Sequence, residues 1–347
     1  MVDLTHLTHK GTEEIETERL ILRRFGMGDA NEIFREWASY ENVVKFLTWE
    51  KHASIAQTKT FLVDVIGGYA RLDKYCWGIE LKNEGMLIGS IDAKITDGRS
   101  RVAELGYCLG ERFWNFGYAT ESVRAVSDYM FYDVNLNRLE AYHSVENPAS
   151  GRVLIKAGLF REGHMRQKYM TADGAYQNSE LYGLIKEDFA KQYEPEIKEF
   201  LNLDEIALSA YSISLKCTEY YPGNAKKNHV PGYNFDITDK SSGTVFGQIS
   251  LRLGFTDGLY YGGHIGYSVD EQYRNVGVAT AACHIILNLA KAHKFKKILI
   301  TNNHQNKASR RVCEKIGAKL VRIAALPEGH DLYAKGQRLQ CIYELLL

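Results

Sequence analysis

The sequence carries one arrangement of residues twice, and this repetition restricts the possible folds more than any other feature. The first copy, ELGYCLGERFWNFGYAT, occupies residues 104–120, and the second, HIGYSVDEQYRNVGVAT, occupies residues 264–280. Gly106 and Gly117 recur as Gly266 and Gly277, and both displacements (266 − 106 and 277 − 117) equal 160 residues. A repeat of this length is a duplicated domain, because the units of solenoid proteins span only about 20–50 residues.

Further matches follow each copy. Asn147 and Ser150 recur as Asn306 and Ser309, both displaced by 159 residues (306 − 147 and 309 − 150). The one-residue change in displacement is what a surface loop tolerates. A length of 347 residues also suits two domains. We therefore predict a tandem duplication.

Composition narrows the class of protein. Hydrophobic residues make up 45% and charged residues 25%, which is enough to build two cores. Lys plus Arg and Asp plus Glu number 43 each, so no net field draws the chain to nucleic acid or to a membrane, and we expect neither partner. The six cysteines form no C-x-x-C pair, which favours reduced thiols and argues against a zinc site or any other metal. The polar first residues and the lack of a long apolar run favour a cytoplasmic protein.

Hydrophobic periodicity predicts strands and helices in alternation. Apolar residues follow the period of a strand before Gly110 and the period of a helix after Gly117. In the first half, the same reasoning predicts strands at residues 19–25, 75–81, 86–95, 102–109, 138–144, 160–170 and 177–185, and helices at residues 29–40, 54–69, 117–132 and 149–157. Mixed strands covered by helices indicate an α/β (α+β) fold.

We divide the chain into four segments on these patterns. They are a flexible tail at 1–15, a first domain at 16–188, a partly helical linker at 189–207 and a second domain at 208–347. The second domain begins with predicted strands at 211–218 and 233–237, and only a short polar stretch lies between them. Since two helices occupy this interval in the first half, the second domain is predicted to lack them.

The repeated turn has a clear chemical use. A glycine at the start of a helix leaves backbone N–H groups unpaired, with the positive end of the helix dipole behind them, which favours phosphate or pyrophosphate. A plain turn before a helix is an equally good interpretation of one copy alone. The spacing excludes a P-loop, G-x-x-x-x-G-K-S/T, and a dinucleotide fingerprint, G-x-G-x-x-G.

Both copies resemble a known signature. R-N-V-G-V-A at 274–279 matches the R/Q-x-x-G-x-G/A signature of the GNAT acyl-CoA N-acyltransferases. W-N-F-G-Y-A at 114–119 matches the variant W-G-x-G-Y-A-T-E of the subgroup that acetylates the N-termini of ribosomal proteins, with Asn115 in place of a glycine. The segments ETERLILR, NRLEAY and NPASGRVLIKAG in the first half are also similar to that subgroup. The resemblance covers residues 16–188, and in the second half it is strong only at 262–319.

This resemblance implies two GNAT domains in tandem, each a mixed, mostly antiparallel central sheet flanked by helices. It implies direct transfer of an acetyl group from acetyl-CoA to a primary amine, either a protein N-terminus or a small amine such as an aminoglycoside. The pantetheine arm would lie between the strands at 102–109 and 138–144. The residues it assigns to cofactor binding are Cys108, Leu109, Trp114, Asn115, Phe116, Gly117, Tyr118, Ala119, Thr120, Asn147 and Ser150 in the first half, and Val269, Arg274, Asn275, Val276, Gly277, Val278, Ala279, Thr280, Asn306 and Ser309 in the second.

Two residues of the first half are candidates for proton transfer. Glu104 is the candidate base, because a carboxylate on a mostly buried strand suits a base near neutral pH. Its alternative is a solvated carboxylate or an ion pair with Arg101. Ser150 is the candidate near the leaving sulfur, and its alternative is a helix cap, for which Asn147 is the better residue. Many family members carry a tyrosine acid four residues after that serine position, where this chain has Leu154.

The second half keeps the cofactor motif and changes the chemistry. His264 replaces Glu104, Ser309 replaces Ser150 and Cys313 replaces Leu154. A histidine suits a base at neutral pH, although a lone histidine on a strand is more often structural. Three interpretations stay open. The first is a main active site in the first domain with a catalytic or supportive second domain. The second is a bifunctional enzyme that acts on two acceptors or twice on one polyamine-like acceptor, and the third is an acetyl-CoA-binding sensor or scaffold without catalysis.

Overall fold

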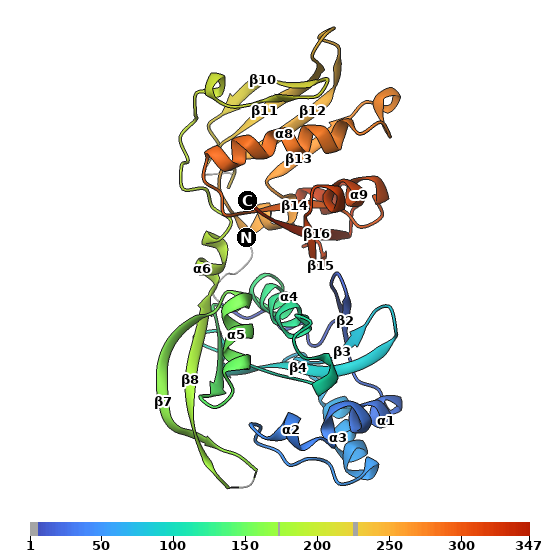
Figure 1. Cartoon of the computed structure of the whole chain (residues 1–347), viewed down its shortest axis with the longest axis vertical. Helices are drawn as coiled ribbons and strands as arrows, with labels where there is room; N and C mark the ends of the chain where they lie inside the picture. The colour runs from blue at the N-terminus through green and yellow to red at the C-terminus, as the bar shows by residue number, and fades with distance from the viewer. Residues whose placement is uncertain (1–5, 173, 225–227) are drawn as a thin grey trace. The chain divides into compact units, whose positions relative to one another are not determined.

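The computed structural model describes residues 6–172, 174–224 and 228–347. The chain forms two compact units, Met1–Lys186 and Glu187–Leu347, and each contains one eight-stranded sheet (Figure 1). This arrangement confirms the predicted tandem fold.

In the first unit, the strands lie in the order β1-β2-β3-β4-β5-β6-β8-β7. Strands β5 and β6 are parallel, and the other neighbouring pairs are antiparallel. A parallel pair needs a crossover connection, which α4 provides. The strands are β1 Ile15–Glu16, β2 Leu20–Arg23, β3 Cys76–Leu81, β4 Met86–Asp97, β5 Val102–Leu109, β6 Arg138–Ser144, β7 Phe160–Met170 and β8 Tyr176–Ile185.

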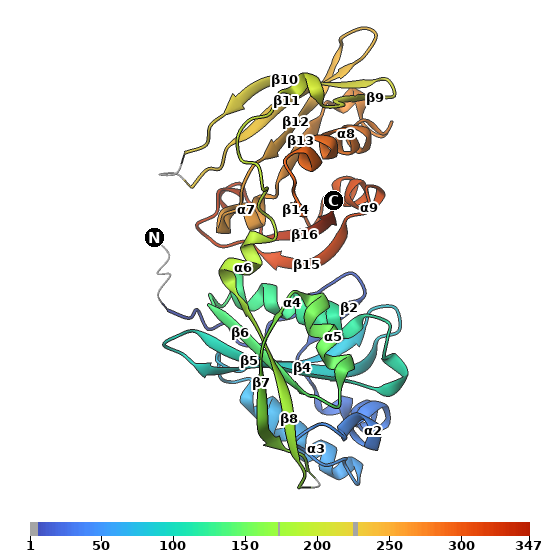
Figure 2. The same ribbon diagram turned by 60° about the vertical axis from the view of Figure 1, so that its left-hand side comes forward.

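Helices cover both faces of the first sheet. α4 (Tyr118–Tyr132) and α5 (Pro148–Ala157) lie on one face, and α1 (Ala30–Ile33), α2 (Glu41–Val44) and α3 (Ile55–Gly68) lie on the other (Figures 1 and 2). Because both faces are covered, Trp77 and Ile79 of β3 are fully buried, and Cys76 and Gly78, which alternate with them along the strand, are buried as well.

Two expectations for the first unit need correction. The helix predicted at 29–40 is divided, since α1 passes at once into a π-helical segment, Phe34–Ala38. The predicted tail is anchored to the first sheet around Thr12, while residues 1–5 lie outside the described residues. Thr12 is buried because its hydroxyl donates to Lys74 O (2.8 Å) and accepts from Cys76 N (3.0 Å), and Glu13 O accepts from Trp77 Nε1 (2.6 Å).

The second sheet repeats the first, strand for strand. Its order is β15-β16-β14-β13-β12-β11-β10-β9, and β13 and β14 form its parallel pair, connected by α8 (Val278–Ala292). The strands are β9 Ser209–Ala210, β10 Ile213–Tyr221, β11 Gly232–Asp239, β12 Val245–Arg252, β13 Ile265–Val269, β14 Lys297–Asn303, β15 Lys319–Ala325 and β16 Leu339–Leu346. The remaining helices are α7 Asp257–Gly262, α9 Lys307–Lys315 and α10 Asp331–Ala334.

The second unit differs in the covering of its sheet. Among its described residues there is no helix between β10 and β11, where the first unit places α1 to α3. The strands of this sheet alternate accordingly. On β12, Ile249 and Leu251 are buried in the core, while Gln248 is exposed and Ser250 and Arg252 are half-buried. A sheet with one face in water requires this alternation.

The segment expected to link the units is packed in the second unit. It contains α6 (Lys186–Lys191) and the buried residue Tyr193. Tyr193 O accepts a hydrogen bond from His264 Nε2 (3.0 Å), and Ile197 O accepts one from His293 Nδ1 (2.8 Å). Two buried histidines therefore hold this segment against the sheet.

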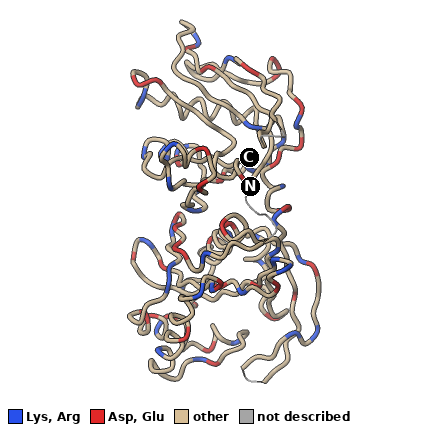
Figure 3. Tube along the Cα trace, turned by 180° about the vertical axis from the view of Figure 1, so that it is seen from behind, with Lys and Arg blue, Asp and Glu red and all other residues tan. Residues whose placement is uncertain are grey.

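Charged residues of both signs alternate along both units (Figure 3), in keeping with the equal numbers of acidic and basic residues. Within the described part of the chain, we find no helix whose length and apolar character would let it cross a membrane.

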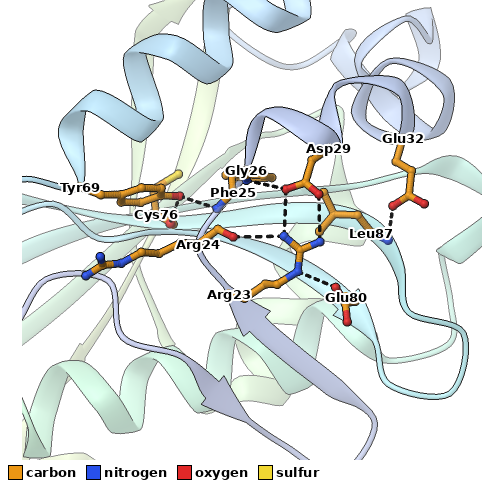
Figure 4. Close-up of polar contacts among 10 residues, drawn as sticks. All are labelled: Arg23, Arg24, Phe25, Gly26, Asp29, Glu32, Tyr69, Cys76, Glu80 and Leu87. Carbon is orange, nitrogen blue, oxygen red and sulfur yellow. Dashed lines mark hydrogen bonds and ion pairs between the residues drawn. The ribbon is translucent and has the colours of Figure 1, made fainter.

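Arg23 ties the end of β2 to the start of the helical segment that follows (Figure 4). Its guanidinium donates to both carboxylate oxygens of Asp29 (2.9 and 3.0 Å) and to Glu80 on β3 (2.5 Å). Asp29 also accepts from Gly26 N (2.8 Å). These carboxylates raise the pKa of the Arg23 guanidinium above its ordinary value, so the group carries its charge at every working pH.

We predict that Arg23→Ala lowers the free energy of unfolding of the first unit by about 1–3 kcal/mol, because two partly buried carboxylates lose their charged donor. All four tryptophans lie in the first unit, so tryptophan fluorescence during a urea titration reports on it alone. Arg71→Ala is the matched control, since Arg71 pairs with Asp73 in solvent and its loss should leave the midpoint unchanged. Equal midpoints for both variants would contradict the prediction.

Candidate active site

The repeated turn has the same backbone in both units. Gly117 and Gly277 are the N-cap residues of α4 and α8, with φ of 86° and 91°. Asn115 and Asn275 precede them with φ of 68° and 64°. Left-handed conformations at these four positions turn the chain sharply into the helix, where the first N–H groups have no partner within the helix. A Cβ at Gly277 would meet open space, so a ligand can approach the backbone there.

Most residues that the resemblance assigned to the cofactor lie on this turn and helix start. Phe116 and Val276 project into solvent, being 60% and 75% exposed. The others on the turn are Tyr118, Ala119 and Thr120 in the first unit and Val278, Ala279 and Thr280 in the second, all within the first helical turn. Each unit thus has its own set of backbone N–H groups at the start of its helix.

Trp114 and Arg274 fix the turn to the preceding strand. Trp114 Nε1 donates to Leu109 O (2.8 Å), and Arg274 Nε donates to Val269 O (2.9 Å). Leu109 and Val269 end β5 and β13. A tryptophan in one unit and an arginine in the other thus donate to the carbonyl of the equivalent strand-end residue. Each therefore has a structural role in its turn.

Arg19 is a residue of this site that the sequence alone did not single out. Its guanidinium donates to Phe116 O (3.0 Å), pairs with Glu121 (2.7 Å) and lies over the Tyr118 ring, 4.6 Å from the centroid. It therefore places a positive charge beside Gly117 and balances an acidic residue in the first turn of α4. The sequence feature that could have indicated Arg19 is its position in the ETERLILR segment, which resembles the family.

A serine–tyrosine pair recurs in both units at the next helix. Asn147 and Asn306 cap α5 and α9, as the alternative for Asn147 predicted. The hydroxyl of Ser150 lies 2.8 Å from that of Tyr107 on β5. The equivalent hydroxyls of Ser309 and Tyr267 lie 2.7 Å apart. Burial raises the pKa of both tyrosines, which therefore stay protonated at neutral pH.

The residues four positions after these serines, Leu154 and Cys313, do not supply an acid. Leu154 is fully buried and apolar. Burial raises the pKa of the Cys313 thiol to about 12, and Asn302 Nδ2 lies 3.4 Å from its sulfur. On β5, burial likewise raises the pKa of the Cys108 thiol, to about 11, so that thiol is not a nucleophile near neutral pH.

The central strands separate just beyond Glu104. β5 and β6 are paired at Val102↔Arg138, Ala103↔Leu139 and Glu104↔Glu140, and the pairing ends there. Glu104 is half-buried and lies opposite Lys94 of β4. Its charge contributes, after burial, to the raised pKa of Tyr142 on β6. Arg101, the expected alternative partner of Glu104, donates from NH1 to Asn135 O (3.2 Å).

Asp92 is the residue that the sequence analysis missed. It lies on β4 opposite Gly106, and its Oδ1 is 3.1 Å from the point that a Cβ on Gly106 would occupy. Part of the Asp92 side chain reaches solvent, while many protein atoms lie close to its carboxylate. The resulting loss of hydration raises the pKa of Asp92 to about 6, with Lys74 opposing and the charge of Glu104 adding to the shift. Its signal in the sequence was an acidic residue that follows the largely apolar stretch 86–91 of β4.

The second unit has different groups at these positions. Ser250 lies opposite Gly266 and donates to its carbonyl oxygen (3.4 Å). The guanidinium of Arg252 lies 3.3 Å from the point that a Cβ on Gly266 would occupy. Ser250 thus takes the position of Asp92, His264 that of Glu104 and Arg252 that of Lys94, so neither carboxylate of the first unit has an acidic counterpart.

The environment of His264 is at odds with its expected role as a base. The side chain is fully buried. Its Nδ1 accepts from Leu299 N (2.9 Å), so its Nε2 carries the proton and donates to Tyr193 O. Burial lowers its pKa to about 4. Both nitrogens are engaged, and neither is left for an acceptor amine.

Comparisons with known proteins agree with this architecture. The family described as "Acetyltransferase (GNAT) domain" matches residues 19–159 and 187–319. An uncharacterised N-acetyltransferase of Bacillus subtilis is 33% identical over 172 residues, which are 50% of this chain and 96% of that protein. The ribosomal protein uS5-alanine N-acetyltransferase of Escherichia coli is 23% identical over 50% of this chain and 92% of its own length. A crystal structure of a GNAT-family acetyltransferase from Bacillus anthracis superposes with a TM-score of 0.46, at 26% identity, over 50% of this chain and 99% of its own.

The buried histidine predicts how the second unit responds to acid. The pKa of His264 lies below its ordinary value of 6.5, so the unfolded chain binds the proton more tightly and stability is lost as the pH falls from 6.5 towards 4. This loss amounts to roughly 3 kcal/mol from His264 alone. Urea titrations followed by circular dichroism should show it, with tryptophan fluorescence identifying the transition of the first unit.

Two variants check this assignment. His264→Asn should flatten the loss of stability with acid, whereas His284→Gln, which removes an exposed histidine of α8, should leave it intact. Equal stability of the second unit at pH 7 and pH 4.5 would refute a neutral, buried His264.

Proposed function

This chain belongs to the GNAT acetyltransferase family, and from this premise we propose that it transfers the acetyl group of acetyl-CoA to a primary amine in its first unit. The observation that carries the proposal is the joint presence of two elements in that unit. One is the glycine-capped start of α4, suited to a pyrophosphate, and the other is a pair of carboxylates beside Gly106, suited to a protonated amine.

The residues of the first unit fit acetyl-CoA. The N–H groups of residues 116–120 would receive the pyrophosphate, with Arg19 adding positive charge. The pantetheine arm would lie where β5 and β6 are no longer paired, along Cys108 and Leu109. Acetyl-CoA supplies an acetyl thioester there, and a backbone N–H of β5 would stabilise the negative charge that develops on its oxygen.

The side chains of the first unit divide the proton transfers between them. A carboxylate of the pair, Glu104 or Asp92, takes the proton of the acceptor ammonium. Ser150, held by the Tyr107 hydroxyl, donates a hydrogen bond towards the leaving sulfur. Because Leu154 replaces the usual tyrosine acid, this serine–tyrosine pair is the polar group of α5 and β5 that is available for that purpose.

For the acceptor, we favour a protein or peptide N-terminus over a small amine. The support is the similarity of residues 16–188 to enzymes named for ribosomal protein acetylation, including the uS5-alanine N-acetyltransferase. Small amines stay as the alternative.

The second unit is proposed to bind acetyl-CoA without a comparable transfer activity. It keeps the glycine-capped helix and the serine–tyrosine pair, whereas Ser250 and the buried His264 stand where the first unit has carboxylates. Sensing of acetyl-CoA, or support of the first unit, is the function that this combination favours. A second activity on a different acceptor is the alternative.

Calorimetric titration of acetyl-CoA tests the cofactor sites. We predict two sites in the wild type, loss of one in Gly117→Asp and loss of the other in Gly277→Asp, because a carboxylate on a left-handed N-cap blocks and repels the pyrophosphate. Gly85→Asp is the matched control. Gly85 also has a positive φ and open space at its Cβ, but it lies in the turn between β3 and β4.

The outcomes separate the two units. A single site that disappears only with Gly117→Asp would remove the second unit as a cofactor site. Absence of binding by the wild type would refute the proposed function altogether.

A further inference from the structure

We infer that Asp92 is the catalytic base of the first unit, and that Glu104 holds the positive charge of the acceptor beside it. This inference rests on the proposed acetyl transfer to an amine. It assigns the removal of the proton to Asp92 on β4, the strand next to β5, which carries the candidate from the sequence, Glu104. It also defines the acceptor class as a protonated primary amine that lies against two carboxylates.

The register of the central strands places Asp92 closer to the reaction than Glu104. Glu104 belongs to the last pair that joins β5 to β6, so it lies where the strands are still in contact. Gly106 follows two residues later on the same face of β5, beyond the end of that pairing, and Asp92 lies directly opposite it. The room for an acyl group begins only past the last pair, which is the level of Asp92.

Gly106 leaves the carboxylate of Asp92 uncovered. Its Oδ1 is 3.1 Å from the point that a Cβ on Gly106 would occupy, so a side chain at residue 106 would crowd this oxygen. Glycine instead leaves the carboxylate open to a ligand that lies along β5. The exposure of Asp92 on β4, between the buried residues Ile91 and Ala93, agrees with such access.

The charges around Asp92 keep it suited to accept a proton. Lys74 precedes β3, Cys76 lies on β3, Lys94 on β4, and Glu104 and Cys108 on β5. Loss of hydration and the charge of Glu104 raise the pKa of Asp92 to about 6, against the two lysines. A base with this pKa is ionised at pH 7 and still holds a proton well enough to remove it from an ammonium.

Glu104 has surroundings that suit charge recognition. It lies between Lys94 on one side and Glu140 on the other. Arg138 neutralises Glu140 through a 2.6 Å hydrogen bond, so Glu104 does not stand beside an unpaired like charge. An ammonium between Glu104 and Asp92 would satisfy both carboxylates.

The second unit provides an internal comparison. It has the same parallel pair, the same glycine and the same serine–tyrosine pair, but Ser250 occupies the position of Asp92. Its hydroxyl donates to Gly266 O and cannot take a proton from an ammonium. The presence of a base therefore distinguishes two otherwise similar sites.

The chemical step balances as follows. Asp92 takes one proton from the ammonium, and the freed nitrogen lone pair forms a bond to the thioester carbonyl carbon. The carbon–sulfur bond then breaks, and the electron pair leaves with sulfur. The nitrogen, now an amide, gives its second proton to that sulfur by way of the Ser150 hydroxyl, and Asp92 releases the first proton to water. The products are the N-acetyl amide, the CoA thiol and one proton.

The test is the pH dependence of kcat/KM, measured as release of CoA thiol from acetyl-CoA with an alanine-initiated peptide and, separately, with spermidine. For the wild type, we expect kcat/KM to fall below an inflection near pH 6. Asp92→Asn should lower kcat by about 10²–10⁴-fold and remove that inflection, because only free amine then reacts. Asp92→Ser, which copies the second unit, should behave alike.

Glu104→Gln separates the two carboxylates. It should raise the KM for the amine and move the inflection to lower pH, since the charge of Glu104 no longer raises the pKa of Asp92. Glu84→Gln is the matched control, as it removes an exposed carboxylate from the turn between β3 and β4 and should change neither quantity. Tryptophan fluorescence and acetyl-CoA calorimetry establish that each variant is folded and binds the cosubstrate.

The outcomes distinguish this inference from the function on which it rests. Turnover within threefold of the wild type in Asp92→Asn, or loss of the inflection in Glu104→Gln alone, would overturn the assignment of Asp92 and leave the acetyl transfer standing. A wild type that binds acetyl-CoA and acetylates neither acceptor would overturn both together.

Discussion

The parallel pairing of the two central strands is the constraint on which the rest of each unit depends. All other neighbouring strands are antiparallel, so the chain must cross the sheet once, and α4 or α8 makes that crossing. The crossing places the glycine-capped start of the helix next to the end of β5 or β13. The paired stretch is short, three residue pairs in one unit and one in the other, and the strands then separate. The N–H groups that we propose for the pyrophosphate and the gap that we propose for the acyl chain would thus arise from one topological feature.

The two units show what this scaffold permits once one face of the sheet loses its cover. In the first unit, which has α1 to α3, the buried residues of β4 are Leu87, Ile88, Gly89, Ile91 and Ala93, whereas Asp92 and Lys94 are exposed on the opposite side of the alternation. Without such helices, β12 alternates polar and apolar residues, and Ser250 and Arg252 are ordinary residues of a wetted face. The same position of the sheet therefore carries a carboxylate in one unit and a hydroxyl in the other.

Features carried by neighbouring residues could be predicted from the sequence. The glycine turn, the helix that follows it and the caps at Asn147 and Asn306 all depend on contacts within a few residues. Asp92 could not, because its importance depends on the register between β4 and β5. The Tyr107–Ser150 contact joins residues 43 apart, and the engagement of His264 depends on Tyr193, 71 residues away. The anchoring of Thr12 was missed for the same reason, since its partners just before and at the start of β3 lie 62 and 64 residues away in the sequence.

The duplication also helps to distinguish residues that serve the cofactor from residues that serve the acceptor, which a single domain would not allow. The second unit retains the glycine cap, the donor to the strand-end carbonyl and the serine–tyrosine pair, and it has replaced both carboxylates. If the serine–tyrosine pair served the base, there would be no physical reason for it to persist where the base is absent. Its persistence in both units is consistent with a role beside the cofactor arm and its sulfur. The carboxylates are present in one unit alone, which supports our proposal that they serve the acceptor amine.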